Sequence, residues 1–267
     1  MIKGIQTAAM GMNVQMIKQN VIANNLANAD TTGFKREMAL FQQADIQYPV
    51  VPGGCPTCTT SPDSSCCGNS SQENTAALDV IYKKRSPIMS ETYTVFENGG
   101  LKPTQNPLDV GIEGDAFFSV QTPLGVRYTR SGSFTMNTEG VMVNQSGYEV
   151  QGTNGPINIA GKNIAIGSDG TISVDGEVRG QLSLTSFADK RQLQKSGDNL
   201  FIASDNAEQT ELQNVSVAQG FLETSNVNAI REMVDMITAY RSYEANQRSI
   251  TAQDTTLGLA VNDVGQA

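Results

Sequence analysis

Near both ends of the chain, apolar residues recur every three or four positions, which is the spacing of one face of an α-helix. The N-terminal stretch, residues 5–29, has no proline and only one glycine, Gly11. The C-terminal stretch, residues 226–262, also has no proline, and its one glycine is Gly258. We therefore predict two terminal helices, with apolar positions that include Ile5, Met12 and Leu26 in the first and Ile230, Met233, Val234, Ile237, Tyr240 and Tyr243 in the second.

Local signals mark where these helices end and begin. The turn at residues 30–33 should end the first helix, because Gly33 tolerates the left-handed conformation that closes helices. Asn226 and Asn228 are both candidates for the N-cap of the second helix. Glu232, in its first turns, carries the charge that the positive end of a helix dipole favours.

The middle of the chain has the alternating pattern of short strands separated by turns. Residues 117–121 and 126–130 flank a turn that contains Gly125, and residues 171–174 and 177–179 flank Asp175-Gly176, a strong hairpin signal. Many short strands at close spacing favour a small antiparallel sandwich or barrel. The predicted fold class is α+β, with N- and C-terminal helices that pair as a coiled coil and a central, mostly antiparallel β domain between them in the sequence.

We divide the chain into four segments. Residues 1–35 form the N-terminal coiled-coil helix, and residues 36–80 form an extended connector with a cysteine-rich loop. Residues 81–218 form the central β domain, and residues 219–267 form the C-terminal coiled-coil helix. The two helices lie outside the β core, so their apolar faces must be buried elsewhere.

Composition narrows the possible functions. The 267 residues include 18 basic and 27 acidic side chains, a formal charge of −9, which disfavours nucleic-acid binding. The absence of histidine excludes a Ser-His-Asp triad and a histidine-ligated metal. No apolar run reaches the roughly 18 residues of a membrane span, and we expect no cleaved signal peptide. We predict no catalytic residues, cofactor, metal or small-molecule substrate.

One acidic cluster offers an alternative to that prediction. Asp109, Glu113 and Asp115 have the residue types of a carboxylate pair or a calcium loop. Their glycine spacing fits better with a tight turn that leads into the strand at Phe117. The competing function, a secreted carbohydrate-active enzyme or adhesin that uses Asp109 and Glu113, leaves the terminal helices unexplained.

All four cysteines lie in the connector, at Cys55, Cys58, Cys66 and Cys67. A bond between the adjacent Cys66 and Cys67 would be strained, which leaves two pairings of these residues with Cys55 and Cys58. We predict disulfides in an oxidising compartment. A four-cysteine metal site and a loop of free thiols are the alternatives.

The stretch from residue 22 to residue 35 is unusually rich in asparagine. Asn24, Asn25 and Asn28 fall within five residues of a predicted helix, although asparagine is a poor helix former. Small apolar neighbours such as Leu26 suit close helix packing, with side-chain amides that bond across the seam. These three residues, together with the apolar positions of the two helices named above, are therefore the candidates for an assembly interface.

Several motifs resemble those of the flagellar basal-body rod and hook protein family. At the N-terminal end they are Ala23-Asn24-Asn25-Leu26-Ala27-Asn28 and Thr32-Gly33-Phe34-Lys35. In the middle they are Gly114-Asp115-Ala116-Phe117-Phe118 and Tyr128-Thr129-Arg130-Ser131-Gly132-Ser133-Phe134. Near the C-terminus the motif is Gly220-Phe221-Leu222-Glu223-Thr224-Ser225-Asn226-Val227-Asn228. The likeness covers nearly the whole chain except about residues 46–80, where the cysteine-rich loop departs from the family pattern.

The resemblance implies a structural subunit and no enzyme. In this family the terminal helices pair in the inner wall of a helical tube, and the β domain forms the outer layer. Subunits pass through the flagellar export apparatus without a cleaved signal and assemble beyond the inner membrane, in the periplasmic space. The partners are then other copies and other rod subunits. The missing Gln-x-Gly-x-Gly-Val segment favours the proximal over the distal rod, with the distal rod as the alternative.

Overall fold

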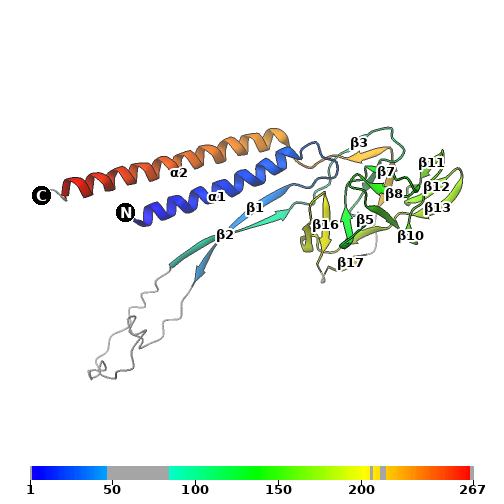
Figure 1. Ribbon diagram of the computed structural model, residues 1–267, viewed down its shortest axis with the longest axis horizontal. Helices are drawn as coiled ribbons and strands as arrows, with labels where there is room; N and C mark the ends of the chain where they lie inside the picture. Colours follow the sequence, from blue (N-terminus) through cyan, green and yellow to red (C-terminus); the bar gives the residue numbers. More distant parts are fainter. Residues whose placement is uncertain (1, 47–83, 205–206, 211–214, 265–267) are drawn as a thin grey trace, which may run out of the picture. The chain divides into compact units, whose positions relative to one another are not determined.

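The structure, a computed structural model, describes residues 2–46, 84–204, 207–210 and 215–264. Two helices flank a central set of strands, as the sequence predicts (Figure 1). Residues 1–40 and 90–267 form one compact unit, and residues 41–89 form a second. The four cysteines lie outside the described residues, so the predicted disulfides stay a prediction.

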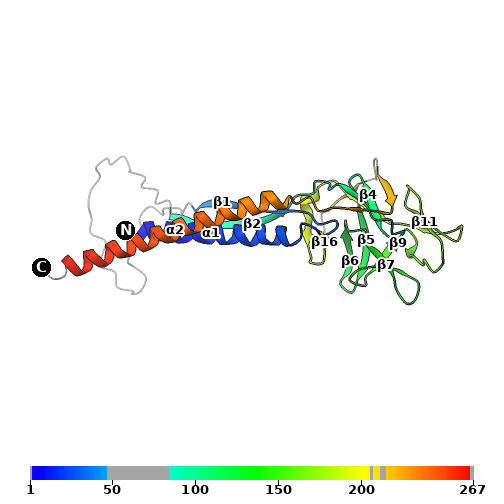
Figure 2. The same cartoon turned by 90° about the horizontal axis from the view of Figure 1, so that it is seen from above.

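The terminal helices are α1 (Ile2–Ala27) and α2 (Ala229–Val264). They lie side by side in both views (Figure 1 and Figure 2). The Asn228 side chain accepts a hydrogen bond from Arg231 N at 3.1 Å, so Asn228, and not Asn226, is the cap of α2. Gly33 follows the turn after α1 with φ +67°, the left-handed conformation expected there.

The strands between the helices are short and pair in antiparallel fashion. Over the described residues the largest sheet has ten strands, with the order β15-β16-β6-β5-β9-β8-β7 and with β10, β14 and β17 branching from it. Its strands are β5 (Phe117–Thr122), β6 (Gly125–Thr129), β7 (Phe134–Met136), β8 (Met142–Asn144), β9 (Glu149–Gly152), β10 (Gly155–Pro156), β14 (Leu184–Phe187), β15 (Leu193–Lys195), β16 (Leu200–Ala203) and β17 (Gln209–Thr210). The 3₁₀ helix η1 (Lys190–Gln192) precedes β15.

Smaller sheets complete the described chain. One contains β11 (Ile164–Ile166), β12 (Thr171–Val174) and β13 (Glu177–Gln181), and its β12–β13 turn is the hairpin predicted at Asp175-Gly176. Three pairs join β4 (Val110–Glu113) to β18 (Ser216–Gln219), β3 (Leu101–Pro103) to β19 (Phe221–Glu223), and β1 (Glu37–Ile46) to β2 (Lys84–Thr94). The pairs of β4 with β18 and of β3 with β19 bring the segment that precedes α2 onto strands from the start of the β domain.

Two hydrophobic clusters form the core of the β domain. The larger includes Phe118 and Phe134, whose rings meet edge to face with centroids 5.0 Å apart. The smaller gathers Phe117, Phe187 and Phe201 with other aromatic side chains. The residues of both clusters come from strands of the β domain and the loops between them, and none belongs to α1 or α2. The β domain therefore has its own core.

Candidate assembly interface

The seam between α1 and α2 follows a seven-residue repeat. Asn25 Nδ2 donates to Glu232 Oε2 at 3.3 Å, near the C-terminal end of α1 and the N-terminal end of α2. Gly11 faces Asn246, because an added Cβ at Gly11 would lie 3.0 Å from Asn246 Nδ2. Gly4, one heptad before Gly11, faces Gln253, one heptad after Asn246. The helices are therefore antiparallel and in one register, with small residues of α1 opposite amide side chains of α2.

A buried polar network closes the seam where α1 ends and α2 begins. The Asn25 amide donates to Glu37 O at 2.8 Å and accepts from Glu37 N at 2.9 Å. Glu232 Oε1 pairs with Arg36 Nε at 2.7 Å. Because Asn25 and Glu232 are both buried, these bonds satisfy groups that would be costly to leave unpaired.

The largest apolar side chains at the start of α2 point away from this seam. Ile230 is 76% exposed, and its neighbours on the same face are between 51% and 61% exposed. We call this face the outer strip; it consists of Ile230, Met233, Val234, Ile237 and Tyr240. Large exposed apolar surfaces on soluble proteins are typical of interaction sites.

The remaining predicted interface residues lie in different places. Tyr243, Ile5, Met12 and Leu26 are half-buried. Asn25 makes the side-chain hydrogen bond that was predicted across the seam, with Glu232. Asn28 instead bonds back to Asn24 O at 2.9 Å within α1, and Asn24 is exposed. The sequence pattern could not separate these three asparagines, because the difference depends on which of them faces α2.

Three charged residues meet where the chain passes between the helices and the β domain. Glu223 Oε1 accepts from Lys35 Nζ at 2.7 Å, Glu223 Oε2 accepts from Arg130 Nε, and all three side chains are only 2% exposed. We call Lys35, Arg130 and Glu223 the joint. Each belongs to a different motif identified in the sequence, but their pairing was not predicted, since 188 residues separate Lys35 from Glu223.

The backbone is closely packed around the joint. Gly33 N donates to Glu223 O at 2.9 Å. A Cβ added at Gly33 would lie 2.5 Å from Ser131 N, and one at Gly99 would lie 1.9 Å from Thr224 O. Because both obstacles are backbone atoms, neither position accommodates a side chain without a shift of the chain.

Burial and mutual attraction act in opposite directions on the charges of the joint. Burial disfavours the ionised Glu223 carboxyl, but the neighbouring charges of Arg130 and Lys35 outweigh it, and the pKa of Glu223 is lowered. Burial lowers the pKa of Lys35, and its attraction to Glu223 opposes this only in part.

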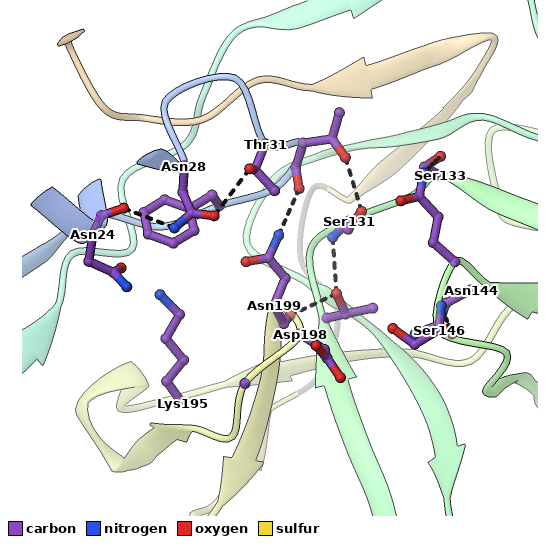
Figure 3. A pocket seen from close by; sticks show the side chains of 15 residues that line it. Asn24, Asn28, Thr31, Ser131, Ser133, Asn144, Ser146, Lys195, Asp198 and Asn199 are labelled. Atoms are coloured by element: carbon purple, nitrogen blue, oxygen red, sulfur yellow. Dashed lines mark hydrogen bonds between the residues drawn. The ribbon is translucent and has the colours of Figure 1, made fainter. Parts of the chain in front are cut away.

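A polar pocket of about 410 Å³ lies between the end of α1 and the β domain (Figure 3). Asn199 Nδ2 donates to Thr32 O at 3.2 Å, and Thr32 and Ser131 share a hydroxyl hydrogen bond of 3.1 Å. Lys195 extends toward Asn24 in Figure 3, and its ammonium lies 3.9 Å from the centre of the Phe34 ring. Amides and hydroxyls dominate the lining, which suits hydrogen bonding.

The acidic residues considered above are engaged in local structure. Asp109 accepts from Asn106 Nδ2 at 3.0 Å, and Asp115 pairs with Lys190 at 2.7 Å. Gly114, between Glu113 and Asp115, has φ +104°, as a tight turn requires. In the part of the chain that the structure describes, no group of three acidic, cysteine or histidine residues is placed to hold a metal. Within the same part, no helix is long and apolar enough to cross a membrane.

Three protein-family models match this chain. Residues 5–35 match the flagella basal body rod protein family, and residues 111–174 match the D1 domain of the flagellar hook protein FlgE/F/G. Residues 218–263 match the C-terminal region of the flagellar basal body rod FlgEFG proteins. The first and third matches coincide with the two helical segments, and the second falls in the β domain.

Known proteins are similar to the chain over nearly its whole length. The flagellar basal-body rod protein FlgG of Buchnera aphidicola subsp. Schizaphis graminum is 36% identical, over 96% of this chain and 98% of its own. FlgG of Bacillus subtilis is 31% identical, over 98% and 99% respectively. The flagellar hook-basal body complex protein FlhO of the same organism is 28% identical over the full length of both chains.

Proposed function

This chain belongs to the flagellar basal-body rod protein family and is a structural subunit of the rod, and from this premise we propose that it polymerises through its terminal helices into the torque-transmitting axial shaft. Family membership also implies assembly with other rod and hook subunits of the flagellum. The proposal concerns which surfaces make that assembly.

The outer strip is the observation that carries the proposal. Its five side chains are at least half exposed, although each would favour burial by roughly 1.5–3 kcal/mol when fully covered. One helix pair has a single mutual seam, and α2 already uses another face for it. Helices of neighbouring copies would cover the strip, and head-to-tail contacts of this type that do not close into a ring produce a filament.

The seam itself is weakly held within one chain. Gln253 Oε1, which lies opposite Gly4 in the seam, is buried without a hydrogen-bond partner within the described residues. A buried polar group without a partner costs about 1–3 kcal/mol. Isolated helices without extensive packing are marginal in water. We therefore propose that the helices become fully ordered when copies assemble.

The remaining elements of the proposal follow from the family. The subunit would leave the cell through the flagellar export apparatus without a cleaved signal peptide and assemble in the periplasmic space. It would bind no nucleic acid or small-molecule substrate and catalyse no reaction. The terminal segments, 1–35 and 219–267, would form the inner wall of the rod. The β domain, 81–218, would form its outer layer, and the connector would be 36–80.

The axial position of the subunit is a separate question. The names of the relatives state no position along the rod. The sequence features above favoured the proximal rod, with the distal rod as the alternative. Gold labelling of a tagged chain in isolated basal bodies, viewed by electron microscopy, distinguishes the two positions.

An Ile230→Asp substitution tests the assembly proposal. It places a charge in the proposed contact, which should cost several kcal/mol in the assembled state. We expect the variant not to polymerise, as measured by light scattering, and cells that carry it not to swim. Val178→Asp is the matched control, because Val178 is 71% exposed on β13, far from either helix in sequence. Normal assembly of the Ile230 variant would overturn the proposal.

A further inference from the structure

The joint connects the two places where the chain passes between helix and β domain. Lys35 lies between α1 and β1, and Glu223 is the last residue of β19, shortly before α2. Their 2.7 Å ion pair therefore fixes the end of one terminal segment against the start of the other. Asn226 reinforces the link, since its Oδ1 accepts from Arg36 N at 2.7 Å.

We propose that this joint is ordered before assembly and that it sets the register in which α1 and α2 meet. The inference rests on the proposed function, because it concerns how the helices are positioned for the shaft. It assigns to Lys35, Arg130 and Glu223 a positioning role that acts through the backbone on both helices.

The bonds of the joint depend on the β domain and not on the helices. Arg130 donates to the carbonyls of Ala116, Ile112 and Gly114, the last two at 3.1 and 2.6 Å. Lys35 Nζ also donates to Glu97 O at 2.7 Å. None of these partners belongs to α1 or α2, and the β domain has its own core. The joint can therefore persist while the helices are disordered.

Backbone hydrogen bonds join both terminal segments to the same region. Gly99 N donates to Glu223 Oε1 at 2.8 Å, and Thr224 N donates to Gly100 O at 2.8 Å. On the N-terminal side, Gly33 N donates to Glu223 O. The two segments are thus held against each other as well as against the β domain.

A joint at this place restricts the register of the helices. Sliding one helix by a heptad means a shift of about 10 Å, at 1.5 Å per residue. Arg36 and Glu37, which bind Glu232 and Asn25, follow Lys35 directly, and two residues span at most about 7 Å. With Lys35 fixed to Glu223, the seam contacts of Asn25 and Glu232 can form only in the observed register or close to it.

Cysteine cross-linking of the unassembled full-length chain tests the proposal, because mild oxidation captures the register of transient encounters between the two helices. In a background with Cys55, Cys58, Cys66 and Cys67 replaced by serine, Gly11→Cys/Asn246→Cys reports the observed register. Gly11→Cys/Gln253→Cys reports a slip of one heptad. Under mild oxidation we expect the first pair to cross-link at least tenfold more than the second. Adding Lys35→Met should bring the two yields within about twofold.

Two further variants keep the result interpretable. Arg179→Met removes the cation of another ion pair of the β domain, with Glu177, and should leave the preference unchanged. Gly33→Ala should abolish the preference without removing a charge, because its Cβ would meet the backbone of Ser131. An undiminished preference in both Lys35→Met and Gly33→Ala would overturn the proposal.

Hydrogen exchange of the same unassembled chain tests the order of events. The amides of Gly33 and Thr224 should exchange as slowly as that of Val110 in the β domain, and at least tenfold more slowly than those of α1. Exchange of Gly33 and Thr224 at the rate of α1 would overturn the proposal. Failure to polymerise would contradict the proposed function and leave these measurements valid.

Discussion

At the scale of single residues, Glu223 shows how a buried carboxylate can be kept charged. It accepts hydrogen bonds from Lys35, from Arg130 and from the backbone of Gly99, so both of its oxygens have donors. Removing one partner of such a buried pair costs about 3–5 kcal/mol, because the remaining charge is left without compensation. Substitution of Glu223 should be the most damaging change in the joint, since it leaves two buried cations.

The lowered pKa of Glu223 predicts an acid limit to stability. Its folded pKa lies below the ordinary value of 4.5, so its stabilising contribution is complete above 4.5 and is lost as the pH falls through the folded pKa. NMR titration of the Glu223 side-chain carboxyl carbon should give a midpoint below 4.5. The free energy of unfolding, measured in urea, should decline as the pH falls below 4.5. A midpoint at or above 4.5 would contradict this.

Lys35 acts on the alkaline side, and its contribution to stability changes with pH in the same direction as that of Glu223. Its folded pKa lies below the ordinary 10.5, so the unfolded chain binds more protons as the pH approaches 10.5. Stability attributable to Lys35 therefore rises with pH between the folded and the ordinary value. The joint thus favours folding least in acid.

At the scale of elements, the seam between the helices combines small residues with amides. Gly11 leaves room for Asn246, and Gly4 leaves room for Gln253. Glycine inside a helix costs roughly 0.5–1 kcal/mol of stability relative to alanine. Its presence at two positions of α1 that face α2 is explained by the close approach of the two helices.

A comparison of two glycines tests this explanation. Gly11→Leu should lower the thermal midpoint of the assembled helices, since overpacking costs about 1–3 kcal/mol. Adding Asn246→Ala should recover most of the loss by making room. Gly258→Leu is the control, because no atom lies within 4 Å of an added Cβ there. Circular dichroism at 222 nm during heating gives the midpoints; equal effects of the two leucine substitutions would contradict close packing at Gly11.

Periodicity in the sequence predicted the local elements well. The helices and the hairpins β5–β6 and β12–β13 depend on neighbours in the sequence, so their patterns were visible. The joint and the seam register depend on pairings between distant segments. Lys35, Arg130 and Glu223 stood in the quoted motifs, but nothing local indicates that they meet. The pairing of β1 with β2 was also missed, because a long connector separates the two strands.

At the scale of the whole molecule, order in the terminal helices is linked to association. We expect the isolated chain to keep a stable β domain while most amides of α1 and α2 exchange rapidly with solvent, since the outer strip is uncovered and the seam contains a buried amide oxygen without a partner within the described residues. Hydrogen exchange read by mass spectrometry checks this before and after polymerisation. Strongly protected helices in the dilute monomer would contradict it.

The hydrogen bond from Gly33 N to Glu223 O has a consequence for how such proteins diversify. This bond joins the two ends of the segment that runs from residue 33 to residue 223. The segment is therefore a closed insertion between the two terminal helices. Strands and turns far from that crossing can lengthen, shrink or be exchanged while the crossing stays the same. Relatives could in this way vary their outer surface for different neighbours and retain a common inner wall.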